Sequence, residues 1–323
     1  MAPRWIAALV FIMLALVPEL AGSYTTGQMT RYLTYALLAM SLSLVWGRGG
    51  ILCFGQAIFF GIGGYAMAAL GKGMLGGALS YSLIGLAAAM LLSAAVAAIL
   101  GYFLFWGRGL SGPFLAIVTL AIALIMERLM SNWYAMGGYN GLLNVPPLNF
   151  GRAGGALELS DRLPLYYFVL AVVALVYGVV DRLLGSPFGI VLTAVKTNPR
   201  RAAFFGYEVM RVRIAVFVIG AAVAGLAGAL FVSIDGFASP TLIGFGLSTE
   251  ALIWVALGGK DIILAALMGA IVVRMVEGWL SDMLGDAWLL ALGLFFMLSV
   301  VLLPQGLIGS LLALATRRRR TAR

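Results

Sequence analysis

The sequence predicts an all-α membrane protein with about eight to ten transmembrane helices, and three observations support that prediction. Of its 323 residues, 63% are hydrophobic and only 10% are charged, whereas a soluble domain carries roughly 25% charged residues. The 42 glycines are typical of helices that pack closely inside a bilayer. Apolar runs of about 20 residues, the length that spans a membrane, recur along the chain. We therefore expect residues 1–323 to form one transmembrane domain.

Each apolar run is bounded by charged, glycine or proline residues. The predicted spans are 5–21, 30–46, 54–71, 79–105, 113–133, 164–184, 212–233, 246–259, 261–280 and 287–312. The second and third spans are close together and 246–259 is short, so any of these three could be re-entrant or broken. The first run resembles a secretory signal, but Pro18-Glu19 ends it without a clear cleavage site, which favours a short membrane helix.

The basic residues are distributed unequally between the two sides of the predicted membrane. One side receives Arg4, Arg48, Arg108, Lys196, Arg200, Arg201, Arg211, Arg213, Lys260 and the basic tail 313–323. The other receives Lys72, Arg152 and Arg162, accompanied by Glu158, Asp161, Asp282 and Asp286. Because lysine and arginine accumulate on the cytoplasmic side, both termini are predicted to be cytoplasmic. The longest loop on the opposite side, 134–163, reads as ordered loop and not as helix.

Composition also excludes several functional classes. The net charge is +9, and the basic residues lie between the apolar runs and in the C-terminal tail. This distribution indicates membrane topology and contacts with anionic lipid, and it argues against a nucleic-acid partner. Cys53 is the single cysteine, which rules out an internal disulfide. The chain has no histidine, which excludes HExxH zinc sites and Ser-His nucleophile pairs. We expect neither an enzyme nor a metal site.

A dense polar stretch, residues 185–211, interrupts this apolar chain. Residues 190–197 can form two helical turns. Asn198 is a favoured N-cap and Pro199 suits the first helical position, while Gly206 fits just past the end of a helix over Pro199–Phe205. So short a helix is unstable alone in water and needs a surface to pack on. The alternative is a solvated basic loop, but Phe204-Phe205 favours a docking element.

Several motifs resemble one known family. Arg201-Ala202-Ala203-Phe204-Phe205-Gly206 is similar to the EAA-x3-G coupling pattern of permease subunits in ATP-binding-cassette importers, with Arg201 in place of its glutamate. The motifs SLSLVWGRGGILCFGQAIFFGIGGYA, GGYNGL, SPFGIVLTAVKTNPRRAAFFGYEV, LGGKDIILAALMGA and PQGLIG occur in the order of branched-chain amino-acid permeases of the LivM/LivH type. The sequence departs from this family pattern at two places. Lys260-Asp261 stands where relatives often have small residues, and Ala265-Ala266 stands where they often have a Gly-Pro pair. Urea and short-amide permeases share these motifs.

The resemblance implies a multi-pass protein of the bacterial inner membrane that works in a complex. Implied partners are a second permease subunit, two ATPase subunits and an extracytoplasmic solute-binding protein. No GxxxxGK[ST] phosphate loop is present, so we expect no cofactor on this chain and ATP on the partner subunits. The residues expected to couple to the ATPase are Asn198, Pro199, Arg200, Arg201, Ala202, Ala203, Phe204, Phe205 and Gly206.

Polar groups within apolar spans indicate a solute path, because they are costly in a membrane. The candidates are Gln56, Thr119, Glu127, Asn140 and Glu250, with Arg274 and Glu277 also considered. Each has a structural alternative: Glu127-Arg128 could snorkel from a span end, and Arg274 and Glu277, three residues apart, could satisfy each other.

Two other functional classes fit the sequence less well than a permease subunit. An ion-coupled secondary transporter would show carboxylates near the midplane or internal repeats; few such carboxylates and no convincing repeat are present, and the polar stretch would be unexplained. A membrane enzyme would need a catalytic constellation that the scattered acids do not form.

Overall fold

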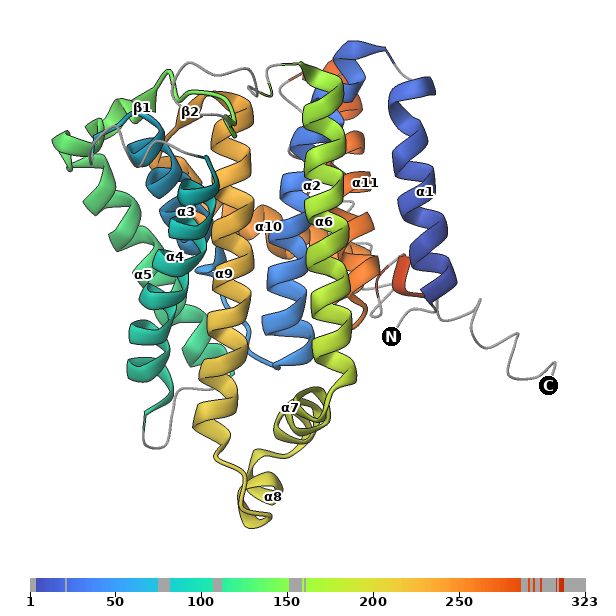
Figure 1. Cartoon of the computed structure of the whole chain (residues 1–323). Coiled ribbons are helices and arrows are strands. Elements are labelled where there is room, and N and C mark those ends of the chain that lie inside the picture. The colour runs from blue at the N-terminus through green and yellow to red at the C-terminus, as the bar shows by residue number, and fades with distance from the viewer. Residues whose placement is uncertain are drawn as a thin grey trace.

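The computed structural model is a bundle of long helices with two short helices projecting from one end (Figure 1). It describes residues 4–20, 22–74, 82–106, 112–150, 159, 161–285, 290, 293, 297, 306 and 308–310. The helices are α1 (Arg4–Leu20), α2 (Ser23–Leu42), α3 (Gln56–Gly71), α4 (Ser82–Phe105), α5 (Pro113–Ser131), α6 (Arg162–Gly185), α7 (Pro187–Thr197), α8 (Pro199–Phe204), α9 (Val209–Asp235), α10 (Phe245–Gly258) and α11 (Ile263–Leu284).

The first nine predicted spans each coincide with a described helix. Of the described helices, α4, α5, α6, α9, α11 and the stretch Pro240–Gly258 that contains α10 are long and apolar enough to cross a membrane. The apolar helices Trp5–Leu20 and Gln56–Gly71 are shorter. This all-α architecture confirms the predicted fold class. The tenth predicted span, 287–312, falls almost entirely outside the described residues, as do Arg108, Arg152, Glu158, Asp286 and the tail 313–323.

The prediction for the second span was wrong at its start, because α2 begins at Ser23 and not at residue 30. The first turns of α2 are rich in polar residues, which made them look like loop. Thr26 donates to the Gly22 carbonyl and Thr30 to the Thr26 carbonyl, so these hydroxyls are satisfied within the helix itself. The helix then continues into a π-helix, η1 (Ser43–Arg48), which helical periodicity did not indicate.

The centre of the bundle is the contact among α3, α4 and α9, where small residues let the backbones approach. A Cβ on Gly63 would lie 2.1 Å from the Gly225 carbonyl oxygen, and one on Gly228 would clash equally with the Phe60 carbonyl. Ser93 of α4 completes the contact, because its hydroxyl donates to the Phe59 carbonyl at 2.9 Å. The predicted role of the glycines in helix packing is confirmed here.

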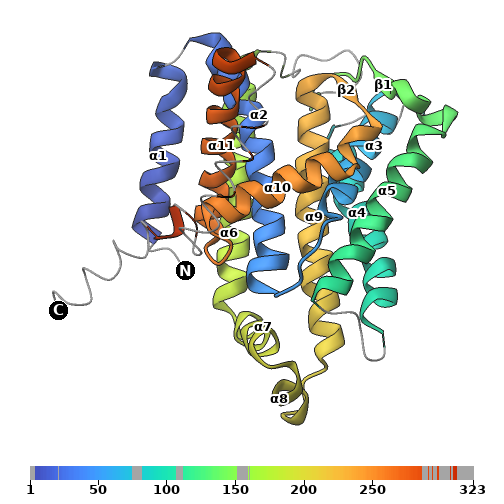
Figure 2. The ribbon, with the colours of Figure 1, turned by 180° about the vertical axis from the view of Figure 1, so that it is seen from behind.

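The pair α10–α11 packs against α2 on the opposite side of the bundle from α6, and α10 runs obliquely across that face (Figure 2). Gly258 of α10 and Gly269 of α11 meet so closely that a Cβ on either would lie within 3.0 Å of the other's Cα. Ala265 and Ala266, where the sequence departs from its relatives, are fully buried next to this contact. Small side chains at these positions therefore suit the close crossing of the two helices.

The loop after α5 is ordered over the described residues 132–150, as predicted. It contains the short 3-10 turns η3 (Tyr134–Met136) and η4 (Gly138–Asn140) and the strand β1 (Leu142–Leu143). β1 pairs antiparallel with β2 (Phe237–Ala238), which follows α9. A third 3-10 turn, η5 (Pro240–Leu242), then leads into α10. These contacts tie the loop to the end of the bundle opposite α8 (Figure 1).

Candidate functional site

The polar segment 185–211 folds into two short helices whose limits follow local sequence signals. Both α7 and α8 begin with proline at the first helical position, where a missing N–H costs nothing. Asn198 separates them: its Oδ1 accepts a hydrogen bond from the Arg201 backbone N–H at 3.0 Å. The predicted N-cap and helix start are therefore confirmed.

The end of α8 is closed by a glycine in the left-handed conformation. Gly206 has a φ of 86°, which side chains with a Cβ adopt rarely. Its N–H donates to the Ala203 carbonyl, and the N–H of Tyr207 donates to the Ala202 carbonyl. This is the Schellman arrangement. It confirms the predicted stop at Gly206, with the helix one residue shorter than the expected Pro199–Phe205.

The outer surface of α8 is open and apolar. Ala202 is buried at 3% exposure and seats the helix on its neighbours, whereas Phe204 and Phe205 are 90% and 82% exposed. Arg200, Arg201 and Ala203 are also exposed. α8 forms the extreme tip of the molecule, beyond the ends of the long helices (Figure 1). Two adjacent phenylalanines exposed at such a tip are typical of a protein contact surface.

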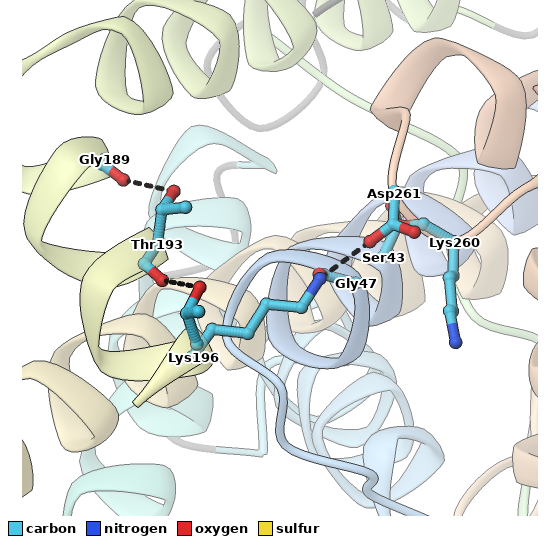
Figure 3. A network of polar contacts seen from close by, with 8 residues as sticks. Ser43, Gly47, Gly189, Thr193, Lys196, Lys260 and Asp261 are labelled. Atoms are coloured by element: carbon cyan, nitrogen blue, oxygen red, sulfur yellow. Dashed lines mark hydrogen bonds and ion pairs between the residues drawn. The ribbon is translucent and has the colours of Figure 1, made fainter. Parts of the chain in front are cut away.

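Lys196 anchors the helix that carries this tip to the rest of the bundle. Its ammonium nitrogen Nζ donates to Asp261 Oδ1 at 2.7 Å and to the Gly47 carbonyl oxygen at 2.5 Å (Figure 3). Asp261 lies in the turn between α10 and α11, and Gly47 lies in η1. One side chain of α7 therefore joins three elements that are far apart in the sequence.

The π-helix η1 and the α10–α11 turn are also in direct contact. Ser43 Oγ donates to the Lys260 carbonyl at 2.8 Å, and the Lys260 ammonium lies 5.4 Å from the centroid of the Trp46 ring. A Cβ on Gly47 would fall 1.7 Å from the Lys260 carbonyl oxygen, so only glycine permits this approach. Single-turn π-helices frequently occur at functional sites.

We call Ser43, Gly47, Lys196, Lys260 and Asp261 the anchor network. It continues along α7, where Thr197 donates to Thr193 and Thr193 to Gly189 (Figure 3). Sequence reasoning missed these functional candidates. Lys196 lay within the polar stretch and Lys260-Asp261 was noted as a departure, but no local pattern pairs residues 65 positions apart.

Two of the predicted solute-path residues are enclosed in the bundle. Gln56 is 1% exposed, and its Nε2 donates to Ser41 Oγ at 3.1 Å. Thr119 is also buried; it accepts from the Phe54 N–H at 3.1 Å and donates to the Ala116 carbonyl. In this conformation Gln56 joins α3 to α2, and Thr119 joins α5 to the loop before α3. Contact of either residue with solute stays a prediction.

Glu127 and Asn140 lie toward the end of the bundle opposite α8. Glu127 is half-buried, and its carboxylate lies against Gly244, where an added Cβ would be 2.5 Å from Oε2. Gly244 is the N-cap of α10, so the carboxylate faces the positive end of the helix dipole. Asn140 is exposed at the end of η4. The structure does not bring these two residues together with Gln56.

Glu250 belongs to an ionic cluster that joins α10, α11 and α2. Arg274 lies 3.0 Å from Glu250 Oε2 and 2.9 Å from Glu277 Oε2. The rings of Tyr35 and Trp254 flank the guanidinium, with their centroids 4.2 Å and 4.9 Å from its Cζ. Arg274 pairs with Glu277, which was the structural alternative to a solute-path role for these two residues, and Glu250 was not predicted to join them.

Comparison with known proteins identifies the family of the chain. A family model described as "Branched-chain amino acid transport system / permease component" matches residues 24–303. The high-affinity branched-chain amino acid transport system permease protein LivM of Salmonella typhimurium is 32% identical over 308 residues, covering 89% of this chain and 70% of the relative. LivM of Escherichia coli is 31% identical over 312 residues, covering 90% and 71%. LivH of Salmonella typhimurium is 24% identical over 284 residues, covering 85% and 91%.

No solved structure matches the chain. The family model covers most of the sequence, and the two LivM proteins align over about nine-tenths of it. The described helices are those of a multi-pass membrane protein. The chain belongs to the permease component family of branched-chain amino acid transport systems.

Proposed function

We propose that this chain is a permease subunit of an ATP-driven importer that carries branched-chain amino acids across the bacterial inner membrane. Its named relatives are permease proteins of branched-chain amino acid transport systems, which supports that solute class over urea or short amides. The partners are a second permease subunit, two ATPase subunits that bind the ATP, and an extracytoplasmic solute-binding protein.

The observation that carries the proposal is the exposed tip at α8. Phe204 and Phe205 present apolar surface beyond the ends of the long helices, where an ATPase subunit can reach them without entering the membrane. Asn198 and Gly206 hold the short helix in shape before any partner binds. A preformed helix loses less conformational entropy on docking. Residues 185–211 are thus proposed to be the cytoplasmic coupling segment.

The anchor network supplies the mechanical connection that coupling requires. A displacement of α8 moves α7, and Lys196 transmits that movement to η1 and to the α10–α11 turn. Both are continuous with long helices of the bundle, α2 and α11. In this proposal, closure of the ATPases therefore shifts α2, α10 and α11 between outward-open and inward-open arrangements.

The proposed orientation rests on the distribution of basic residues. Lys196 and Lys260 both belong to the anchor network, at the end of the bundle from which α8 projects. The positive-inside rule places this basic end in the cytoplasm. With it, we propose that both termini are cytoplasmic.

The test is co-purification of the chain with its ATPase subunits. Ala203→Asp places a charge on the docking surface, and Gly206→Pro removes the N–H that bonds to Ala203 and imposes a negative φ. Both are expected to reduce ATPase recovery while membrane insertion persists. Ala135→Asp, at an exposed alanine toward the opposite end, is the matched control. Wild-type ATPase recovery with Ala203→Asp and Gly206→Pro would contradict the coupling role.

A further inference from the structure

The ionic cluster of Glu250, Arg274 and Glu277 lies at membrane depth. Arg274 is near the middle of α11, about 16 Å along the helix from Ile263 and about 15 Å from Leu284. Charged side chains this far inside a bilayer are rare and mark solute or ion paths. The cluster therefore needs an account beyond joining α10 to α11.

Its charges do not balance. Two carboxylates face one guanidinium, and the ion pairs of the described residues connect no further cation to either glutamate. Arg274 Nε is buried and has no hydrogen-bond partner in the described part of the chain. The cluster thus has an unmatched negative charge and an unused N–H donor side by side.

The two glutamates differ in accessibility. The Glu277 side chain is 6% exposed, whereas that of Glu250 is 36% exposed. Glu250 lies on the incompletely covered stripe of α10, together with Gly246, Thr249 and Ile253. A Cβ on Gly246 would meet nothing within 4 Å. The Glu250 carboxylate is therefore the more accessible partner of Arg274.

The guanidinium is held in place independently of Glu250. The Tyr35 and Trp254 rings flank it, and Glu277 binds its other side. Tyr35 is itself packed against Phe231 and Trp254, with ring centroids 5.2 Å away in both cases. If Glu250 releases Arg274, the arginine keeps its position and presents free N–H donors.

We propose that Glu250 and Arg274 form a transit site for the zwitterionic end of an α-amino acid. The solute ammonium binds Glu250, and the solute carboxylate takes the place of Glu250 on Arg274. This exchange replaces one ion pair with two, and the zwitterionic end adds no net charge at membrane depth. An uncharged solute such as urea cannot make the exchange, and the site therefore selects amino acids. The inference rests on the proposed transport function.

The first experiment is uptake of radiolabelled leucine by the complete complex in proteoliposomes with its solute-binding protein. Glu250→Gln is expected to lower the uptake rate by at least about tenfold, as loss of a charge-assisted hydrogen bond predicts. ATPase recovery and ATP hydrolysis stay at wild-type level. Asp282→Asn, at an exposed carboxylate near the end of the same α11, is the matched control and leaves uptake unchanged.

A second measurement needs no variant. Leucine at millimolar concentration is expected to raise the melting temperature of the detergent-solubilised wild-type complex without the solute-binding protein. Leucinamide, which lacks the carboxylate, and 4-methyl-2-oxopentanoate, which lacks the ammonium, raise it less. Equal shifts with all three compounds, or no shift with leucine, would overturn the site.

The outcomes separate the two proposals. Wild-type uptake by Glu250→Gln overturns the transit site and leaves the importer function standing. If the wild-type complex shows no ATP-dependent uptake, the importer function itself fails. If the Glu250→Gln complex does not assemble, the transit site is tested by the melting temperatures of the wild-type complex with leucine and its two analogues.

Discussion

Lys196 Nζ lies 2.7 Å from Asp261 Oδ1, and this contact ties the helix before the exposed tip to the turn between α10 and α11. The two side chains are partly exposed, at 36% and 57%. Ion pairs this accessible contribute only about 0–1 kcal/mol to stability. The contact therefore adds little to the stability of the fold, and its proposed role is to transmit movement from α8 to the bundle.

Replacing Lys196 is expected to separate ATP hydrolysis from transport. Lys196→Met keeps the length of the side chain but loses both hydrogen bonds, to Asp261 and to the Gly47 carbonyl. We expect ATPase recovery and hydrolysis near wild-type level but reduced uptake, because α7 loses its bond to the part-buried Gly47 carbonyl together with the exposed pair to Asp261. Arg211→Met, which breaks the exposed pair with Glu208, is the control. Unchanged uptake in Lys196→Met would show that the anchor network does not transmit coupling.

The exposed phenylalanines are expected to carry the docking energy at the tip. Burying a phenylalanine side chain stabilises a contact by about 1.5–3 kcal/mol, so Phe204→Ser with Phe205→Ser should weaken ATPase binding by at least about tenfold. Binding of the purified ATPase to the permease in nanodiscs measures this directly. Phe114→Ser, at an equally exposed phenylalanine near the start of α5, should leave the affinity unchanged. An equal loss in both variants would mean that the effect is not local to α8.

Gly47 is expected to tolerate no side chain. A methyl group there would overlap the Lys260 carbonyl, and relieving it requires a backbone shift that costs about 1–3 kcal/mol. Gly47→Ala should therefore lower the melting temperature and displace η1 from the α10–α11 turn. Gly22→Ala, where an added Cβ meets nothing within 4 Å, is the control. Equal melting temperatures of Gly47→Ala and wild type would refute the close contact.

Cys53 offers a labelling test of the loop between η1 and α3. The side chain is 1% exposed, and its burial raises the pKa of the thiol to about 11. Maleimides react with the thiolate, so labelling of the native complex should be very slow at pH 7–8 and become complete after denaturation. Thr197→Cys in a Cys53→Ser background places the thiol on the exposed end of α7 and should label at once. Rapid labelling of native wild-type protein would show that the loop opens readily.

Local features of the fold could be predicted because their signals lie within a few residues. Asn198, Pro199 and Gly206 marked both ends of α8 because caps act through their own backbone neighbours. A pair between Arg274 and Glu277 could be named as an alternative because residues three apart share a helix face. The start of α2 was missed because threonines that bond back to the helix look like loop residues in a composition window.

Contacts between distant elements could not be predicted in the same way. Glu250 reaches Arg274 because α10 and α11 cross at Gly258 and Gly269. The residue periodicity of either helix alone does not specify that crossing. The π-helix at Ser43–Arg48 likewise accompanies tertiary contacts, through Ser43 and Gly47, that its own residues do not specify. Sequence reasoning therefore found the short helix α8, for which docking is proposed, and missed the contacts that anchor it.

The most direct measurement is leucine uptake by proteoliposomes that contain this chain, its partner permease, the two ATPase subunits and the solute-binding protein. ATP added only inside or only outside the vesicles energises the complexes whose ATPase subunits face that side. Ion gradients across the vesicle membrane are imposed separately. We predict uptake that requires ATP on the side of α8, persists without an ion gradient and stops when the ATPase subunits are inactivated. Uptake that survives loss of the ATPase subunits but collapses with the ion gradient would contradict it and establish a secondary transporter.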